Sequence, residues 1–236
     1  MQPDLSRLNA RLTGDAEGAL KVTLSGALGR IAMVSSFGAD SAVLLHMVAQ
    51  IDRATPVLFI DTLMLFEETL AYQHTLAQHL GLENLQVIQP NRAALFARDT
   101  DAVLHRSDTD SCCALRKTRP LEQALQGYDG WITGRKRFQG GARTAIELFE
   151  YDATFGHLKV NPLAGWGAQQ LGAYMDTHAL PRHPLVSRGY PSIGCAPCTS
   201  PVAAGEDPRA GRWRGTNKDE CGIHIVDGRV IRRQAS

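Results

Sequence analysis

The sequence predicts an α/β protein with a mostly parallel central sheet and helices on both faces. Between residues 31 and 133, short apolar runs that resemble buried strands alternate with stretches whose apolar residues recur at helical spacing. Such alternation is typical of parallel sheets, because the connecting helices cover both faces of the sheet. In sheets of this kind, ligands bind at the carboxyl ends of the strands.

Each element follows from its own segment of the chain. Apolar runs predict strands over residues 31–35, 56–60, 85–88 and 130–133, and helical spacing predicts helices over 41–50, 66–80, 92–98 and 114–126. Beyond about residue 180, Pro, Gly and Arg become dense and the periodicity fades. This last part therefore reads as a long loop region organised by ligands rather than by an apolar core.

The composition is that of an ordinary globular enzyme. Of 236 residues, 44% are hydrophobic and 21% charged, and the formal net charge of +1 lacks the basic excess of a nucleic-acid-binding surface. No apolar run reaches membrane-spanning length, and residues 1–5 show no signal-peptide pattern. We therefore expect a cytoplasmic, reduced protein that binds neither membranes nor nucleic acid.

The five cysteines are the most informative residues. Cys112 and Cys113 are adjacent, Cys195 and Cys198 form a C-x-x-C pair, and Cys221 stands alone. Four thiolates suit a 4Fe-4S cluster or a structural zinc ion, which leaves Cys221 as a candidate nucleophile. Free cysteines are often small buried core residues, but the polar, Gly/Pro/Arg-rich surroundings favour a ligand role here. A disulfide framework is not expected in a chain long enough to bury a core.

The loop after the first predicted strand is a candidate phosphate site. It contains Ser35, Ser36, Gly38 and Asp40 and leads directly into a predicted helix. A helix N-terminus offers backbone N–H groups and a positive dipole end to an anion. The alternative is a plain turn in which Asp40 or Ser41 caps the helix. A Walker A loop is excluded, because no Gly-Lys-Ser/Thr follows.

Together these motifs resemble those of a known protein family. The loop resembles the modified PP-loop, S-x-G-x-D-S, of adenine nucleotide alpha-hydrolase-like proteins. Joined to Cys-Cys-x-x-x-Lys, C-x-x-C and Glu-Cys-Gly-Ile-His, it resembles assimilatory adenylylsulfate (APS) reductases of the PAPS/APS reductase family. The resemblance runs from about residue 31 to 224 and includes the segments 61–63, 134–137 and 140–143.

The resemblance implies a reaction and a division of the chain. A thiolate of Cys221 would attack the sulfur of adenylyl sulfate and expel AMP, and reduced thioredoxin or a similar dithiol would then release sulfite. Residues 1–200 would form a nucleotide-binding α/β domain that carries a 4Fe-4S cluster. Residues 201–236 would form a tail with the catalytic cysteine. A homo-oligomer is compatible with the sequence.

The resemblance also assigns roles to single residues. Lys117, four residues after Cys113, would touch both cluster and substrate. His224 would assist Cys221 or cap the local fold, and Asp61 would contact the nucleotide or cap a turn. The expected cluster ligands are Cys112, Cys113, Cys195 and Cys198, and the expected substrate-binding residues are Ser35, Ser36, Gly38, Asp40, Asp61, Lys136, Arg137, Arg143, Arg209 and Arg212.

Three other functions compete with this interpretation. PAPS reductases share the tail motif but typically lack the four cluster cysteines, although some cluster-bearing relatives accept both substrates. PP-loop enzymes that thiolate tRNA sometimes carry a cluster, but Phe37 stands where ATP-using members usually keep glycine. A zinc module would leave Cys221 without a role, and adjacent cysteines are an awkward tetrahedral donor pair.

Overall fold

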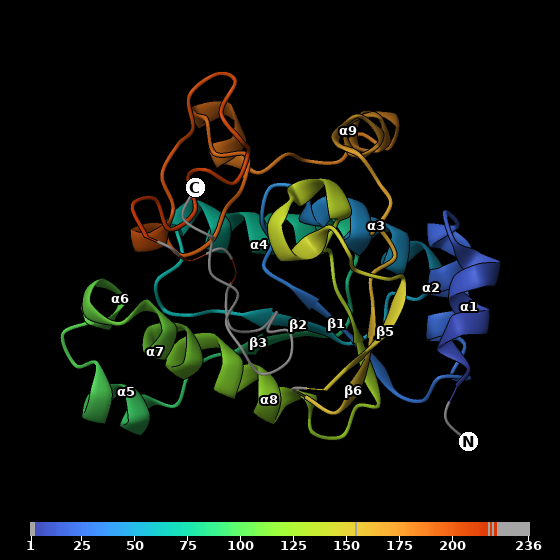
Figure 1. Cartoon of the computed structure of the whole chain (residues 1–236), viewed down its shortest axis with the longest axis horizontal. Coiled ribbons are helices and arrows are strands. Elements are labelled where there is room, and N and C mark those ends of the chain that lie inside the picture. Colours follow the sequence, from blue (N-terminus) through green and yellow to red (C-terminus); the bar gives the residue numbers. More distant parts are fainter. Residues whose placement is uncertain (1–2, 154, 217, 219, 221–236) are drawn as a thin grey trace.

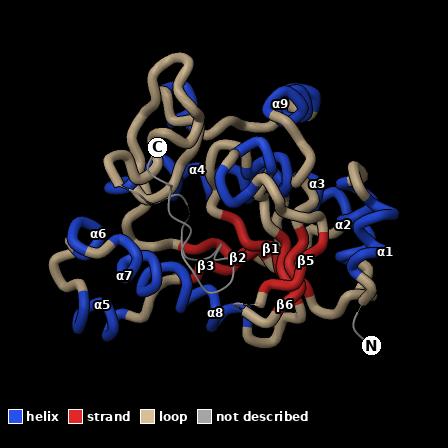
Figure 2. The backbone as a smooth tube through the Cα atoms, in the orientation of Figure 1, coloured by secondary structure: helices blue, strands red, loops and turns tan. Residues whose placement is uncertain are grey.

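A six-stranded sheet forms the centre of the computed structural model, which describes residues 3–153, 155–216, 218 and 220. The strand order is β3-β2-β1-β4-β6-β5 (Figures 1 and 2). All neighbouring strands are parallel except β5, which runs antiparallel to β6. The strands are β1 (Ile31–Ser35), β2 (Val57–Ile60), β3 (Leu85–Ile88), β4 (Gly130–Ile132), β5 (Phe149–Asp152) and β6 (His157–Val160).

Helices cover both faces of this sheet, and a π-helical turn over Ala114–Thr118 joins two of them. Among the described residues, no helix is both long and apolar enough to cross a membrane. The α-helices are α1 (Leu5–Leu12), α2 (Ala16–Leu24), α3 (Ser41–Ile51), α4 (Glu67–Leu80), α5 (Arg92–Arg98), α6 (Leu104–Ser107), α7 (Thr109–Cys113), α8 (Arg119–Leu125) and α9 (Ala168–Thr177).

The alternation of side chains along the strands divides the core in two. Met33 of β1 and Phe59 of β2 pack with α2, α3 and α4 in one apolar cluster. Their neighbours Val34 and Leu58 pack with α8 in a second cluster, around the fully buried Trp131. Successive side chains of a strand point to opposite faces, so a run that is apolar throughout must be covered on both sides.

The predicted fold class is confirmed. All four predicted strands and the helices predicted over 41–50, 66–80 and 92–98 form within one residue of the expected bounds. The prediction of one helix over 114–126 was wrong in its first turn, which is π-helical. The hairpin of β5 and β6 and the helices α1, α2 and α9 were not predicted.

The loop-rich nature of the chain after residue 180 is also confirmed. In its described part, only short 3-10 turns form, at Pro184–Arg188 and Ala196–Cys198. Isolated bridges hold the segment instead, one between Leu65 and Cys195 and one between Thr199 and Arg212. The division of the chain at residue 200 stays a prediction.

The strand order fixes where a ligand can bind. The chain leaves β1 toward β2 and β3 on one side, and then returns to place β4 on the other side of β1. The loops after β1 and β4 therefore diverge, which opens a crevice at the carboxyl ends of these two strands. The first of these loops is the candidate phosphate loop, and the second contains Lys136 and Arg137.

Candidate active site

A cavity occupies this crevice, and we call it the switch-point cavity. Its wall combines the loop after β1, the loop after β4 and arginines from far along the chain. The predicted residues that line it are Ser35, Ser36, Gly38, Asp40, Lys136, Arg143, Arg209 and Arg212. Eight of the ten predicted substrate-binding residues thus lie around one space.

The loop after β1 is anchored by Phe37. Its ring is fully buried and packs edge-on against Phe59, with 5.2 Å between the ring centroids. Its backbone has a positive φ of 48° and its N–H donates to Ser35 Oγ at 3.2 Å. A non-glycine residue rarely adopts this conformation unless the surroundings enforce it. Burial of the ring therefore holds the loop in a bent path around the cavity.

Asp40 does not cap helix α3 with its side chain, which the sequence had left as an alternative. Its carboxylate instead accepts a hydrogen bond from Lys136 Nζ at 3.2 Å. Burial lowers the pKa of Lys136, and the nearby Asp40 carboxylate partly opposes that shift. The pair therefore links the loop after β1 to the loop after β4.

A cluster of arginines meets the carboxylate of Glu220. Arg143 donates from Nη2 to Glu220 Oε2 at 2.9 Å and from Nε to Oε1, and Arg209 Nη2 lies 3.4 Å from Oε1. Burial alone would raise the pKa of Glu220, but the ion pairs with Arg143 and Arg209 outweigh burial and hold the pKa below its ordinary value. The carboxylate is therefore ionised in a buried position.

Arg212 is the third arginine, and its position depends on a glycine. Its side chain stacks on Trp213, with 4.5 Å from Cζ to the ring centroid, and its Nε has no hydrogen-bond partner among the described residues. A Cβ atom at Gly194 would lie 2.2 Å from Arg212 Nη2. Gly194 thus makes room for the guanidinium, and a buried N–H group without a partner favours an anionic ligand.

A second cavity shares these arginines, and we call it the anion cavity. Its wall also contains Lys117, Thr62, Thr69 and Glu220. Four cationic side chains, those of Lys117, Arg143, Arg209 and Arg212, line it together with a single carboxylate, that of Glu220. The excess of positive charge in a largely buried space suits a multiply charged oxyanion.

Beside the anion cavity lie four cysteines, Cys112, Cys113, Cys195 and Cys198, which we call the cysteine quartet. Three are buried and Cys198 is half-buried. Burial, together with the neighbouring cysteines, raises the pKa of Cys112 to about 12. None of the four belongs to the two apolar clusters of the sheet. The four cysteines therefore form a group of their own and are not part of the apolar core.

Cys195 is the member of the quartet nearest to polar partners. Thr62 Oγ1 lies 3.2 Å from Cys195 Sγ. Burial would raise the pKa of Cys195, but the charge of Lys117 and the Thr62 hydroxyl lower it below its ordinary value. Lys117 belongs to the π-helical turn and is half-buried, so it is not the solvent-facing lysine that its helical position alone would allow.

The quartet does not converge on a single ion. Within the described ranges, no three Cys, His, Asp or Glu side chains come together as the ligands of one metal ion. A zinc ion needs its thiolates around one point, whereas each iron of a 4Fe-4S cluster takes its own cysteine. The four thiols nevertheless lie near one another, since Cys113, Cys195 and Cys198 all act on the pKa of Cys112, and sulfur donors suit either kind of centre.

Two predicted substrate residues lie apart from the cavities. Arg137 is exposed and its Nε donates to the carbonyl oxygen of Ile146 at 2.8 Å. Asp61 is buried and accepts from the Leu63 N–H and from Gln89 Nε2, both at 2.9 Å, so it stabilises the turn after β2. Neither residue lines the switch-point cavity or the anion cavity. Cys221 and His224 lie outside the described residues.

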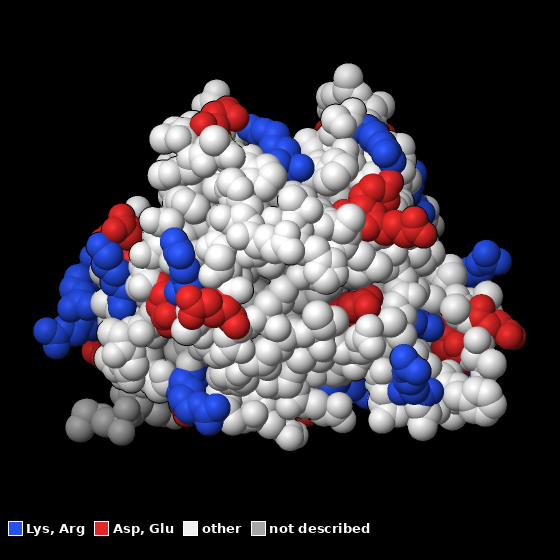
Figure 3. Space-filling model, turned by 180° about the vertical axis from the view of Figure 1, so that it is seen from behind, with Lys and Arg blue, Asp and Glu red and all other residues white. Residues whose placement is uncertain are grey.

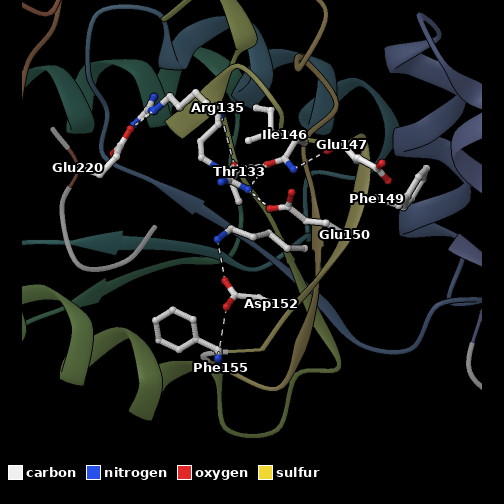
Figure 4. Close-up of polar contacts among 12 residues, drawn as sticks. Thr133, Arg135, Ile146, Glu147, Phe149, Glu150, Asp152, Phe155 and Glu220 are labelled. Carbon is white, nitrogen blue, oxygen red and sulfur yellow. Dashed lines mark hydrogen bonds and ion pairs between the residues drawn. The ribbon is translucent and has the colours of Figure 1, made fainter. Parts of the chain in front are cut away.

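Sequence reasoning missed Arg135, Thr62 and Glu220. Arg135 lines the switch-point cavity, forms an ion pair with Glu150 and donates to Asn161 Oδ1 (Figure 4). No sequence pattern around Arg135 predicts these contacts, because the partners come from later segments of the chain. For Glu220 a signal did exist, namely its position directly before the candidate nucleophile.

Comparison with known proteins decides the family. The model of the phosphoadenosine phosphosulfate reductase domain matches residues 30–201. The chain belongs to this family. The matched range covers the loop after β1, Lys117 and the whole cysteine quartet. Arg209, Arg212 and Glu220 come after it.

Individual reductases are similar over most of their length. Adenosine 5'-phosphosulfate reductase of Mesorhizobium japonicum is 54% identical over 206 residues, which cover 87% of this chain and 80% of the relative. Phosphoadenosine 5'-phosphosulfate reductase of Gloeobacter violaceus is 39% identical over 201 residues, which cover 83% and 82%. The crystal structure of PAPS reductase from Candida auris has a TM-score of 0.73 at 26% identity and covers 86% of this chain and 98% of its own.

Proposed function

We propose that this protein reduces adenylyl sulfate (APS) to sulfite and AMP with electrons from thioredoxin or a similar dithiol. The observation that carries the proposal is the anion cavity, where four cations face one carboxylate between a nucleotide-type loop and the cysteine quartet. Relatives named for this activity, such as the reductase of Mesorhizobium japonicum, support it.

The two cavities suit the two parts of this substrate. The loop after β1 and the start of α3 offer a nucleotide phosphate backbone N–H groups at a helix N-terminus, and Asp40 leaves them uncapped. Guanidinium groups bind sulfate and phosphate oxygens in bidentate fashion, and Arg212 is best placed for this role because its Nε has no partner among the described residues. Arg143 and Arg209 line the same cavity but are paired with Glu220 in this structure. Lys117 adds a further positive charge near the quartet.

The reaction proceeds by two displacements at sulfur. The Cys221 thiolate attacks the sulfate sulfur of APS, an S–S bond forms, and the S–O bond to AMP breaks with its electron pair going to the phosphate oxygen. A thiolate of the dithiol then attacks Cys221 Sγ and sulfite leaves with the electron pair of the S–S bond. The second thiol of the partner resolves the mixed disulfide, so the dithiol is oxidised and Cys221 is regenerated.

The cysteine quartet would hold a 4Fe-4S cluster, with one ligand each from Cys112, Cys113, Cys195 and Cys198. When bound, the cluster supplies a compact charged group ligated by thiolates beside the anion cavity. Lys117 offsets negative charge on that side, since it already lowers the pKa of Cys195. All-thiol ligation supports this assignment, and the adjacent pair Cys112 and Cys113 would be an awkward donor set for a tetrahedral zinc ion.

A separate reductant is required by the count of thiols. Five cysteines minus four cluster ligands leave Cys221 alone, so the chain has no resolving thiol of its own. We therefore infer a dithiol protein of the cytoplasm as partner, and a homo-oligomer stays compatible with this function. Nucleic acid is not part of the proposal, because the net charge of +1 lacks a basic excess. On the face drawn in Figure 3, the described Lys and Arg side chains lie in small groups, close to acidic ones.

A second candidate is a reductase that accepts both APS and PAPS. The relative from Gloeobacter violaceus, named for phosphoadenosine 5'-phosphosulfate, favours this alternative. Sulfite release should be measured anaerobically from each substrate with reduced thioredoxin. We expect a strong preference for APS, and comparable rates would establish dual specificity. Inactivity on both substrates, in protein that holds its cluster, would refute the proposal and direct attention to tRNA thiolation.

Replacing Gly194 by alanine should weaken binding of adenylyl sulfate by roughly tenfold to a hundredfold, the worth of one charged hydrogen-bond donor. The added Cβ would lie 2.2 Å from Arg212 Nη2 and displace that guanidinium, which can move because it ends a flexible side chain. Calorimetric titration in a Cys221→Ser background measures the affinity without turnover. Gly172→Ala is the control, since a Cβ there has no neighbour within 4 Å. Equal affinities in the two variants would contradict the role of Arg212.

A further inference from the structure

Glu220, the last residue that the structure describes, is buried and forms ion pairs with two arginines. Its side chain is 4% exposed, and both of its carboxylate oxygens accept N–H groups from Arg143. The third contact comes from Arg209 Nη2 at 3.4 Å. A bidentate pair fixes direction as well as distance, so the carboxylate has a defined orientation in the anion cavity.

The arginine that holds Glu220 is itself oriented by the fold. Arg143 Nη1 donates to Gln139 Oε1, and the remaining Nε and Nη2 face Glu220. Both Gln139 and Arg143 belong to the 3-10 turns that follow β4. The docking point is therefore built on the turns that follow β4, and Figure 4 shows Glu220 well away from Glu150 and Asp152 of the hairpin.

Lys218 provides a second anchor two residues earlier. Its Nζ lies 2.6 Å from Asp110 Oδ1 and 3.3 Å from the carbonyl oxygen of Thr109, at the start of α7. That helix ends in Cys112 and Cys113. Lys218 thus fixes the chain beside the cysteine quartet, and Glu220 fixes it inside the anion cavity.

These contacts lead to a role in the reaction, and the inference rests on the proposed function. We infer that Glu220 is a positioning residue, whose ion pairs with Arg143 and Arg209 dock the tail and deliver the adjacent Cys221 to the anion cavity. The Cα atoms of neighbouring residues are about 3.8 Å apart, so anchoring one residue strongly restricts the next. A nucleophile held near its target reacts faster than one that must find it, because the orientation is already fixed.

Single-turnover kinetics test this inference. Holoenzyme is mixed with APS without reductant, and AMP release reports the first displacement alone. We expect Glu220→Gln, which keeps the shape but removes the charge, to slow this release on the order of tenfold to a hundredfold. AMP affinity should stay within about twofold, and sulfite release from preformed S-sulfocysteine enzyme by dithiol should be unchanged. Glu220→Asp should recover part of the rate.

The matched control is Glu206→Gln, which removes the charge of an exposed ion pair with Arg214 in the same region. Its AMP release should equal that of the unaltered enzyme. If Glu220→Gln does not fold, Lys218→Met tests the second anchor outside the cavity, and slower AMP release at unchanged AMP affinity is again expected.

Two outcomes would overturn the inference. An unchanged release rate in Glu220→Gln would show that docking does not limit the displacement. Tighter AMP binding with an unchanged rate would show that Glu220 merely occupies the anion cavity until substrate displaces it. Absence of AMP release from the unaltered holoenzyme would instead refute the proposed function itself, so the two failures are distinguishable.

Discussion

Replacement of Cys221 by serine is expected to abolish sulfite release, with a loss on the order of 10⁴-fold or more. A serine hydroxyl is a far weaker nucleophile than a thiolate at neutral pH, and no other cysteine is left outside the quartet to take its place. Nucleotide affinity should be unchanged, because serine keeps the size of the side chain and the cations of the described cavity walls are untouched. Sulfite release and calorimetric AMP binding are the two measurements.

The visible absorption of the bound cluster is the control for this variant. It should match that of the unaltered protein, since Cys221 lies outside the predicted ligand set. Serine in place of Cys195 is the matched comparison and should lose the absorption. Activity of Cys221→Ser within tenfold of the unaltered enzyme would remove Cys221 as the nucleophile.

Removal of the Lys117 ammonium should have the second largest effect. Lys117 lines the anion cavity and lowers the pKa of Cys195, so its charge acts on both the substrate and the quartet. We expect Lys117→Ala to reduce kcat/KM by about 10²- to 10³-fold, as for other preorganised charges near a developing anion. The free energy of unfolding should change by less than about 1 kcal/mol.

Steady-state kinetics and thermal unfolding separate these two effects. Lys21→Ala is a suitable control, because that side chain is 62% exposed and pairs only with Glu17 one turn away. Lys117→Arg should keep part of the activity through its charge. An unchanged rate in Lys117→Ala would show that the lysine serves only the packing of its π-helical turn.

Strands β1, β2 and β4 were predictable because they are short apolar runs buried on both faces. Strand β5 of the hairpin was not predicted, because it is not an apolar run. Two of its four residues are acidic: Asp152 is buried and pairs with Lys159, and Glu150 is half-buried and pairs with Arg135. Pairing between separate segments is a property of the folded chain, so no window of sequence shows it.

Site residues that belong to a sequence motif were predictable, whereas residues that only the folded backbone brings to the site were not. The cysteines and Lys117 follow from motifs, and the structure brings them to one place. In the loop after β4, by contrast, Arg135 and Lys136 are buried at the cavity while Arg137 begins a 3-10 turn and faces solvent. Three adjacent basic residues look equivalent in sequence, and only the local backbone separates them.

The late position of the arginines has a consequence for synthesis on the ribosome. Every strand of the sheet ends by residue 160, whereas Cys195, Arg209, Arg212 and Glu220 all come afterwards. A nascent chain can therefore complete its sheet and bury both apolar clusters while the anion cavity still lacks most of its charges. We therefore expect full affinity for adenylyl sulfate only after residues up to Glu220 have been made, because Arg209, Arg212 and Glu220 line the anion cavity.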